Sequence, residues 1–232
     1  MFDTFTAEEL TAIRLSLKVA LVAALASLPF GVLVGWVLAR TRFPGKALLD
    51  AVVHLPLVLP PVVMGYGLLV TLGTQGAIGA FLKEHLGLVF AFRWTGAALA
   101  CAVMGFPLMV RAIRLSLEAT DRRLEQAAST LGAGPWRVFF TVTLPLAWPG
   151  LVAGSVLAFA KALGEFGATI TFVSNIPGQT QTLPSAIYAF LQVPGGEKEA
   201  ARLVLVAVGI AMAALMLSEW ISRAVARRIA GT

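Results

Sequence analysis

Charged residues and cysteine are both scarce in this 232-residue chain, and each scarcity excludes a class of protein. Asp, Glu, Lys and Arg make up 13% of the residues while hydrophobic types make up 58%, which is more apolar surface than one soluble core of this size can bury. Cys101 is the only cysteine, and the two histidines, His54 and His85, are far apart. An intrachain disulfide is therefore impossible, and no metal site is expected.

The net charge of +6 does not indicate a nucleic-acid partner. The basic residues stand in small groups at the ends of apolar runs, without the aromatic interleaving of a nucleic-acid groove. We interpret the positive charge as a signal of membrane topology. The expected surroundings of the chain are a lipid bilayer.

The N-terminal stretch MFDTFTAEEL is acidic and carries no small-residue cleavage site before the first apolar run. A secretory signal peptide has a basic start and such a site. We therefore expect the first apolar segment to be retained as a membrane helix.

Five apolar segments reach the length of roughly 20 residues that a helix needs to cross a bilayer core. They predict an all-α integral membrane protein, with residues 1–232 forming a single transmembrane domain. The predicted spans are residues 19–39, 51–72, 94–113, 147–170 and 203–221. An odd number of spans places the two termini on opposite sides.

The distribution of Lys and Arg predicts the direction of these spans, because basic residues in short loops stay on the cytoplasmic side. One side carries eleven of them: Arg40, Arg42, Lys46, Arg111, Arg114, Arg122, Arg123, Arg137, Arg223, Arg227 and Arg228. The other side carries six: Arg14, Lys18, Lys83, Arg93, Lys198 and Arg202. The N-terminus is thus predicted outside and the C-terminus in the cytoplasm.

Prolines and small residues mark two further features of the predicted spans. Pro56, Pro60 and Pro61 fall within span 2 and Pro107 within span 3, where they interrupt the backbone ladder as a fixed kink or at a polar cavity. Small residues recur at four-residue spacing, which favours close helix contact. These are Gly31, Gly35, Gly150 and Gly154.

A charged segment, residues 116–146, separates the third and fourth spans. Asp121 can cap a helix that carries an apolar stripe at spacings of three and four residues, made of Leu124, Ala127, Ala128 and Leu131. Gly132 and Gly134 supply a stop, and Pro135 suits the first turn of a second short helix. This pattern fits a docking element and equally an ordinary surface hairpin packed on its own bundle.

The stretch QAASTLGAGPWRVFFTVTLP resembles the EAA loop of bacterial ABC importer permeases. The spacing of that motif is met by Ala127, Ala128, Gly132, Val142, Leu144 and Pro145, with Gln126 at the position of the motif glutamate and Glu125 beside it. The resemblance implies a coupling helix that sits in a groove of a separate ATP-binding subunit. It leaves open whether Gln126 or Glu125 makes the contact. The implied coupling residues are Glu125, Gln126, Ala127, Ala128, Leu131, Gly132, Trp136 and Pro145.

The resemblance covers nearly the whole chain and is closest to the permeases of oxyanion importers. Stretches such as RTRFPGKALLD, HLPLVLPPVV, FPLMVRAIRLSLE and ALGEFGATITFVSNIPGQTQTLPSAIY carry it. It implies a type I importer fold in the bacterial inner membrane, with two copies of the permease around a pore. It also implies two ATP-binding subunits and an extracytoplasmic binding protein for molybdate, with tungstate or sulfate as the alternative substrate.

The chain is expected to have no enzymatic activity of its own. It lacks the GxxxxGK[ST] phosphate loop, and its nearest stretch, FPGKALL, is missing both the first glycine and the hydroxyl residue. ATP and Mg²⁺ are therefore expected in the partner subunit, with no cofactor in this chain. A carrier driven by an ion gradient is the rival interpretation, against which the lack of paired internal repeats counts.

One charged pair falls inside the fourth predicted span. Lys161 and Glu165 are four residues apart on one helix face, where an unpaired charge at the bilayer centre costs at least about 2.5 kcal/mol. They line the translocation pathway, with Ser155, Thr169 and Thr171 as hydroxyl donors, or they form a satisfied ion pair near the outer surface. The following outer segment contains a short apolar piece, residues 183–191, that is too brief to span.

Overall fold

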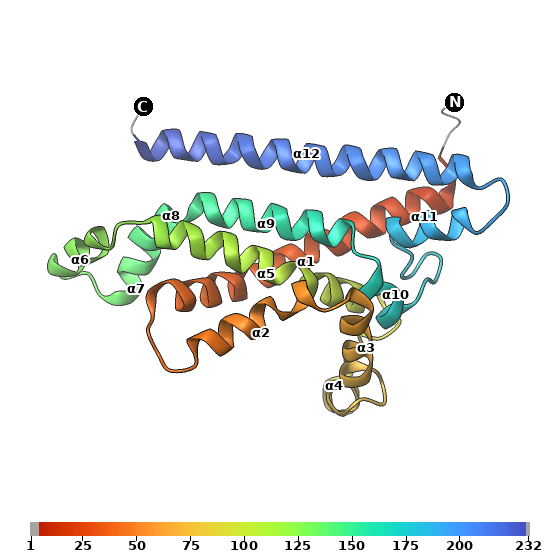
Figure 1. The fold of residues 1–232 in the computed structure, drawn as a ribbon, viewed down its shortest axis with the longest axis horizontal. Coiled ribbons are helices and arrows are strands. Elements are labelled where there is room, and N and C mark those ends of the chain that lie inside the picture. The colour runs from red at the N-terminus through yellow and green to blue at the C-terminus, as the bar shows by residue number, and fades with distance from the viewer. Residues whose placement is uncertain (1–4, 231–232) are drawn as a thin grey trace.

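The computed structural model describes residues 5–230, with side chains described as far as Ile221, and the regular structure of this part is entirely helical. Four long helices run side by side (Figure 1): α1 (Ala7–Arg40), α5 (Trp94–Ala119), α9 (Trp148–Leu163) and α12 (Glu197–Ala230). Helices α1, α5 and α9 pack against one another and form the core. The prediction of an all-α bundle is confirmed.

Small residues bring the core helices into close contact, as their spacing predicts. A Cβ atom on Gly31 would lie 2.7 Å from Met109 Sδ, and one on Gly35 would lie 3.0 Å from Ile113 Cγ2. Gly150 and Gly154 of α9 also approach α5 closely, where the nearest atoms are Ser116 Cβ and the Met109 carbonyl oxygen. Helix α5 is therefore held between α1 and α9 with no room for larger side chains.

The long helices extend beyond the predicted spans. Helix α1 begins at Ala7 because Thr6 and Glu9 form a capping box, in which each side chain accepts a hydrogen bond from the other residue's backbone. Helix α5 continues past residue 113 to Ala119, and α12 runs from Glu197 to Ala230 rather than from 203 to 221. Apolar length locates a membrane crossing, whereas caps decide where a helix ends.

The second predicted span, residues 51–72, is not one straight helix. It consists of α2 (Lys46–Val58) and α3 (Pro61–Leu72), which meet at an angle of 112°. Leu59 and Pro60 are extended at the junction, since a residue before proline avoids the helical region. By contrast, α5 continues through Pro107, so the expected interruption there is limited to one missing backbone donor.

The fourth predicted span, residues 147–170, is also wrong as a single helix. Helix α9 ends at Leu163, and a separate short helix, α10 (Gly167–Val173), follows after a break. Helix α10 packs on α3, where a Cβ on Gly65 would lie 2.6 Å from the Ala168 carbonyl oxygen. Among the described residues, three helices suffice to cross a bilayer, or up to five if each bent helix pair counts as one span.

Two further short helices are α4 (Ala77–Leu86) and α11 (Leu183–Leu191). Helix α11 coincides with the apolar piece predicted to be too brief to span. Its first backbone N–H, from Leu183, donates to Ser16 Oγ of α1 at 2.6 Å. This bond satisfies one of the orphan donors at the start of α11 and attaches it to the core.

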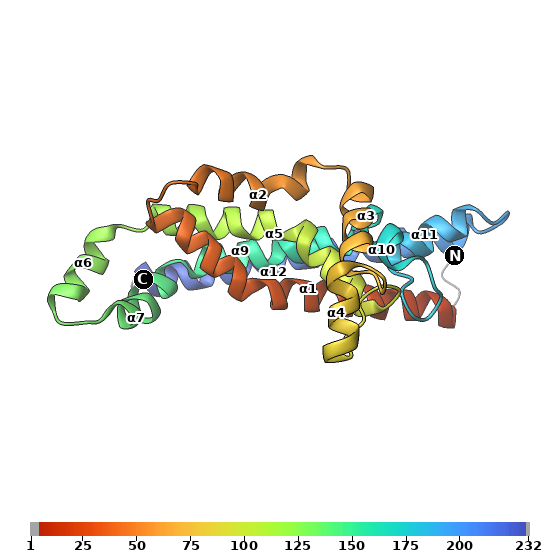
Figure 2. The same cartoon turned by 90° about the horizontal axis from the view of Figure 1, so that it is seen from below.

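The two ends of the bundle differ in what they carry. In both views the loop after α1, the segment between α5 and α9, and the C-terminal end of α12 lie at one end, whereas α10, α11 and the start of α1 lie at the other (Figures 1 and 2). The three basic groups assigned to one side of the membrane therefore share one end. The side chains of Arg223, Arg227 and Arg228 lie outside the described residues.

The helix contact at Gly150 predicts a stability effect. Gly150→Ala places a methyl group where Ser116 Cβ is 2.2 Å away, and overpacking of this kind costs about 1–3 kcal/mol. We expect a lower thermal unfolding midpoint for the purified protein in detergent. Gly209→Ala in α12 is the control, because a Cβ there meets nothing within 4 Å. Equal midpoints for the two variants would contradict the packing.

Candidate functional site

A helical hairpin projects from one end of the bundle (Figure 1). Its first helix, α6 (Arg122–Thr130), begins where the Asp121 carboxylate accepts a hydrogen bond from Arg123 N–H at 2.9 Å. It ends in a Schellman motif, in which the N–H groups of Gly132 and Ala133 donate to the carbonyls of Ser129 and Ala128. Gly132 has φ +85°, so the predicted cap and stop are both confirmed.

The hairpin exposes apolar side chains to an unusual degree. No residue of α6 is buried. Leu131 is 88% exposed and Trp136 is 76% exposed, and Leu124 and Phe140 are also exposed. Ala127 is exposed beside a half-buried Ala128. An ordinary hairpin packed on its own bundle would bury this stripe, so the geometry favours a docking element.

The second arm of the hairpin is helical and ends at a bend. It consists of α7 (Pro135–Val138), a π-helical turn η1 (Phe139–Thr143) and α8 (Leu144–Leu146), and it meets α9 at 67°. Pro145 does not end this helical segment. Pro145 lies inside α8, and the preceding turn widens because proline has no N–H and its ring clashes with the carbonyl four residues back. The bend itself occurs at Ala147.

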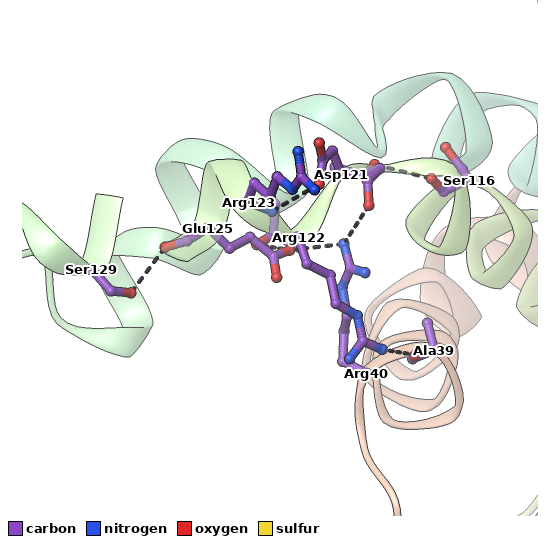
Figure 3. Close-up of polar contacts among 10 residues, drawn as sticks. Ala39, Arg40, Ser116, Asp121, Arg122, Arg123, Glu125 and Ser129 are labelled. Atoms are coloured by element: carbon purple, nitrogen blue, oxygen red, sulfur yellow. Dashed lines mark hydrogen bonds and ion pairs between the residues drawn. The ribbon is translucent and has the colours of Figure 1, made fainter. Parts of the chain in front are cut away.

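A polar cluster attaches α6 to the bundle (Figure 3). Glu125 Oε1 accepts a hydrogen bond from Arg40 Nη2 at 2.9 Å and a second from Thr143 Oγ1 at 2.9 Å. Arg40 Nη2 lies 3.3 Å from the Thr120 carbonyl oxygen, to which it also donates. One carboxylate thus joins α6 to the end of α1 and to the last residue of η1.

Arg122 makes a parallel attachment to α1. Its Nη2 donates to the Ala39 carbonyl oxygen at 3.0 Å (Figure 3). The last four carbonyls of a helix have no partner within the helix and form the negative end of its dipole. A guanidinium from α6 therefore stabilises the C-terminus of α1.

The structure separates the roles of Glu125 and Gln126. Glu125 is directed at Arg40 of its own chain, and its side chain is 20% exposed. Gln126 is exposed, and its side chain makes no hydrogen bond within the described residues. Of the two side chains, the amide of Gln126 is the one available to another protein.

A pocket of about 510 Å³ lies between α6 and the other arm of the hairpin, α7 and η1, beside the end of α1. Trp36 of α1, Gln126 of α6 and Phe139 of η1 are among the residues that line it. Helix α6 is thus not packed flat on the other arm of the hairpin, and the polar cluster connects it to α1.

The predicted pathway residues lie at the break between α9 and α10. Lys161 Nζ is 2.9 Å from Glu165 Oε2, and Glu165 Oε1 accepts a hydrogen bond from Ala168 N–H. Thr169 donates its hydroxyl to the Glu165 carbonyl. These residues are therefore brought together. Ser155 and Thr171 instead donate to carbonyls of their own helices.

The sequence interpretation missed Arg40, Arg122 and Thr143 as residues that attach α6 to the bundle. Arg40 and Arg122 had been counted only as topology signals. The polar Thr143 in an otherwise apolar FFTVTLP stretch was a signal of internal bonding, and it is 2% exposed in the fold. Which distant residues it meets depends on the packing of α1 beside η1, which periodicity does not reveal.

These features define a class of protein: a polytopic membrane protein with a projecting helical hairpin whose apolar side chains are exposed and available to a partner. A family model described as "Binding-protein-dependent transport system inner membrane component" matches residues 27–231. The chain therefore belongs to this family of inner-membrane transport components. The resemblance to ABC importer permeases and the multi-pass membrane location are confirmed.

Individual relatives agree with this assignment. The chain is 62% identical over 226 residues to the molybdenum transport system permease protein ModB of Escherichia coli (strain K12), covering 97% of this chain and 98% of that protein. It is 41% identical over 177 residues to a probable sulfate transport system permease protein, cysT, of Chlorokybus atmophyticus, covering 76% of this chain and 62% of that protein.

A solved structure shares the fold. The MetNI methionine ABC transporter in inward-facing conformations contains a chain that superposes with a TM-score of 0.70 at 18% identity, covering 92% of this chain and 94% of that one. The predicted fold class is thereby confirmed.

The cap at Gly132 predicts a local effect on the hairpin. Gly132→Ala forces an L-residue into the left-handed region, which costs about 1–2 kcal/mol. We expect faster hydrogen exchange at the amides of Leu131 and Ala133, which the cap holds in hydrogen bonds to Ala127 and Ala128, measured by mass spectrometry. Gly134→Ala is the matched control, since Gly134 has φ −67° and no atom within 4 Å of an added Cβ. Identical exchange in both variants would contradict the cap.

Proposed function

We propose that this chain is the translocation subunit of an ATP-driven molybdate importer. The assignment of molybdate as the substrate rests on the 62% identity to a molybdenum permease across almost the entire length of both chains. The sulfate relative is more distant and matches a smaller share of this chain. Tungstate and sulfate are the alternative substrates, because they are tetrahedral oxyanions of the same charge.

We propose that two copies of the chain enclose the pathway and that each presents its hairpin to one ATP-binding subunit. Support comes from Leu131 and Trp136, whose large apolar side chains are exposed at the tip of the hairpin. The contact residues are Gln126, Ala127, Ala128 and Leu131, with Gly132 holding the turn. ATP and Mg²⁺ belong to the partner subunit.

The proposed orientation places the hairpin in the cytoplasm and the start of α1 outside. The gathering of Arg40, Lys46 and Arg122 with the hairpin at one end of the bundle supports it. A binding protein would then deliver the anion at the end that carries α10 and α11. ATP-driven closure of the partner subunits would move the hairpins and expose the pathway alternately to the two sides.

We propose that the break between α9 and α10 lies beside the pathway. Lys161 is 31% exposed while Glu165 is 1% exposed, so the pair presents its cation and buries its anion. A partly exposed ammonium beside an interrupted helix suits a weak, transient contact with an oxyanion. Thr169 and Thr171 lie on the adjoining helix α10, and Ser155 lies earlier on α9.

Reconstitution tests the function. The purified complex in vesicles should import molybdate only when ATP, the ATP-binding subunits and the binding protein are all present. Binding-protein-stimulated ATPase activity with molybdate, tungstate and sulfate in turn identifies the substrate. Uptake driven by an ion gradient without ATP would show a secondary carrier instead.

The docking surface predicts the effect of bulk on α6. Ala128→Trp should lower co-purification of the ATP-binding subunits and lower uptake at least about tenfold, because a large side chain prevents close approach at a well-packed interface. Ala77→Trp on α4 is the control, as Ala77 is exposed and remote from the hairpin. Normal assembly and import for Ala128→Trp would contradict the docking role.

The pathway proposal predicts that the Lys161 ammonium is needed for transport. Lys161→Met alone leaves the buried Glu165 carboxylate unpaired, which is itself destabilising, so Lys161→Met with Glu165→Gln is the informative variant. We expect it to assemble and to import molybdate at least about tenfold more slowly. Full uptake by this double variant would leave Lys161 and Glu165 with a structural role only.

A further inference from the structure

We propose that Arg40, Glu125 and Thr143 form the linkage that transmits displacement of α6 into α1 and α9, with Glu125 as a positioning residue. This inference rests on the proposed function, in which α6 moves with an ATP-binding subunit. It assigns to Glu125 a role inside its own chain, distinct from the docking contact made by Gln126 and the alanines.

Helix α6 has no buried apolar side chain that would hold it against the bundle. None of its residues is buried, and a pocket of about 510 Å³ separates it from α7 and η1. Its most extensive contacts are with α7 and η1, the other arm of the hairpin. A force on α6 therefore reaches the core through the covalent chain and the polar cluster rather than through a packed face.

Two members of the polar cluster, Arg40 and Thr143, are shielded from solvent. The Arg40 side chain is 8% exposed and Thr143 is 2% exposed. Ion pairs in such surroundings interact more strongly than exposed pairs, because the local dielectric constant and salt screening are both lower. Both partners use the same oxygen, Glu125 Oε1, so they cannot respond independently to a shift of α6.

The two partners of Glu125 lie at the ends of helices. Arg40 is the last residue of α1, and its guanidinium also holds the Thr120 carbonyl at the end of α5. Thr143 is the last residue of η1, and its carbonyl accepts the hydrogen bond of Ala147 N–H at the bend into α9. The Glu125 carboxylate on α6 is thus connected through one or two hydrogen bonds to the ends of α1 and α5 and to the start of α9.

The ion pair can adopt a second arrangement. Arg40 Nε is buried without a hydrogen-bond partner, while Glu125 Oε2 makes no hydrogen bond within the described residues. A small rotation would turn the present single contact into a two-bond fork, the stronger geometry of Arg–carboxylate pairs. The fork would be the second discrete arrangement that a coupling element needs.

The experiment uses the complete complex with its ATP-binding subunits and binding protein. Glu125→Gln removes the charge but keeps the shape, so we expect the subunits to co-purify as in the wild type. The ratio of binding-protein-stimulated to unstimulated ATPase activity should fall at least about fivefold, with a matching loss of molybdate uptake. Arg40→Met should have the same effect, and Arg40→Met with Glu125→Gln should be no worse than either alone, since the pair acts as one unit.

Glu118→Gln is the matched control. It removes a carboxylate at the same end of the bundle, bound to Arg114 at 2.8 Å, but that pair lies within one helix. Its stimulation ratio should stay at the wild-type value. Thr143→Val, which removes only the hydroxyl, should lower the ratio in the same direction as Glu125→Gln and serves if the charge variants fail to fold.

Two outcomes would overturn the linkage. A wild-type stimulation ratio in Glu125→Gln or in Thr143→Val shows that the cluster transmits nothing. Loss of co-purification in Glu125→Gln, with normal folding, shows that Glu125 contacts the partner subunit instead. Either result leaves the proposed function standing, because that function is tested by ATP-dependent uptake and by Ala128→Trp.

Discussion

The organisation of this protein depends on how a helix that buries nothing is attached to a tightly packed bundle. Helix α6 cannot be held by the hydrophobic effect, because its apolar side chains are exposed. The carboxylate of Glu125, bound by Arg40 and Thr143, supplies the attachment together with Arg122 at the end of α1. An apolar attachment would have consumed the surface that a partner needs.

The bundle beneath the hairpin is built to move as a body. Glycines on α1 and α9 leave so little space around α5 that a single methyl group would clash, and tightly packed interiors transmit displacement rather than absorb it. The helices are interrupted between α2 and α3 and between α9 and α10. Helices α3 and α10 pack on each other there, so a shift in α9 has a direct route to that region.

The sequence predicted those parts of the fold that depend on local chemistry. Asp121, Gly132 and Pro135 fixed the boundaries of the hairpin helices, and the length of residues 183–191 excluded a further span. The prolines predicted an interruption in the second span but not its angle of 112°, and the break in the fourth span was missed, because apolar length alone does not distinguish a straight helix from two helices packed at an angle. The sequence motif of the loop predicted that α6 is a coupling element. The role of Glu125 could not be predicted, because it depends on a contact with Arg40 at the end of α1, 85 positions away along the chain.

The central claim is that the hairpin and the ends of the core helices move together. Spin labels at exposed positions on α6 and on the loop after α1, such as Arg123 and Arg42, can report the distance between them in the complete complex; Cys101 is buried and so does not compete for the label. The account predicts that this distance stays the same with and without ATP, while distances from α6 to the corresponding helix of the second copy change. A change between Arg123 and Arg42 as large as that between the two copies would contradict it.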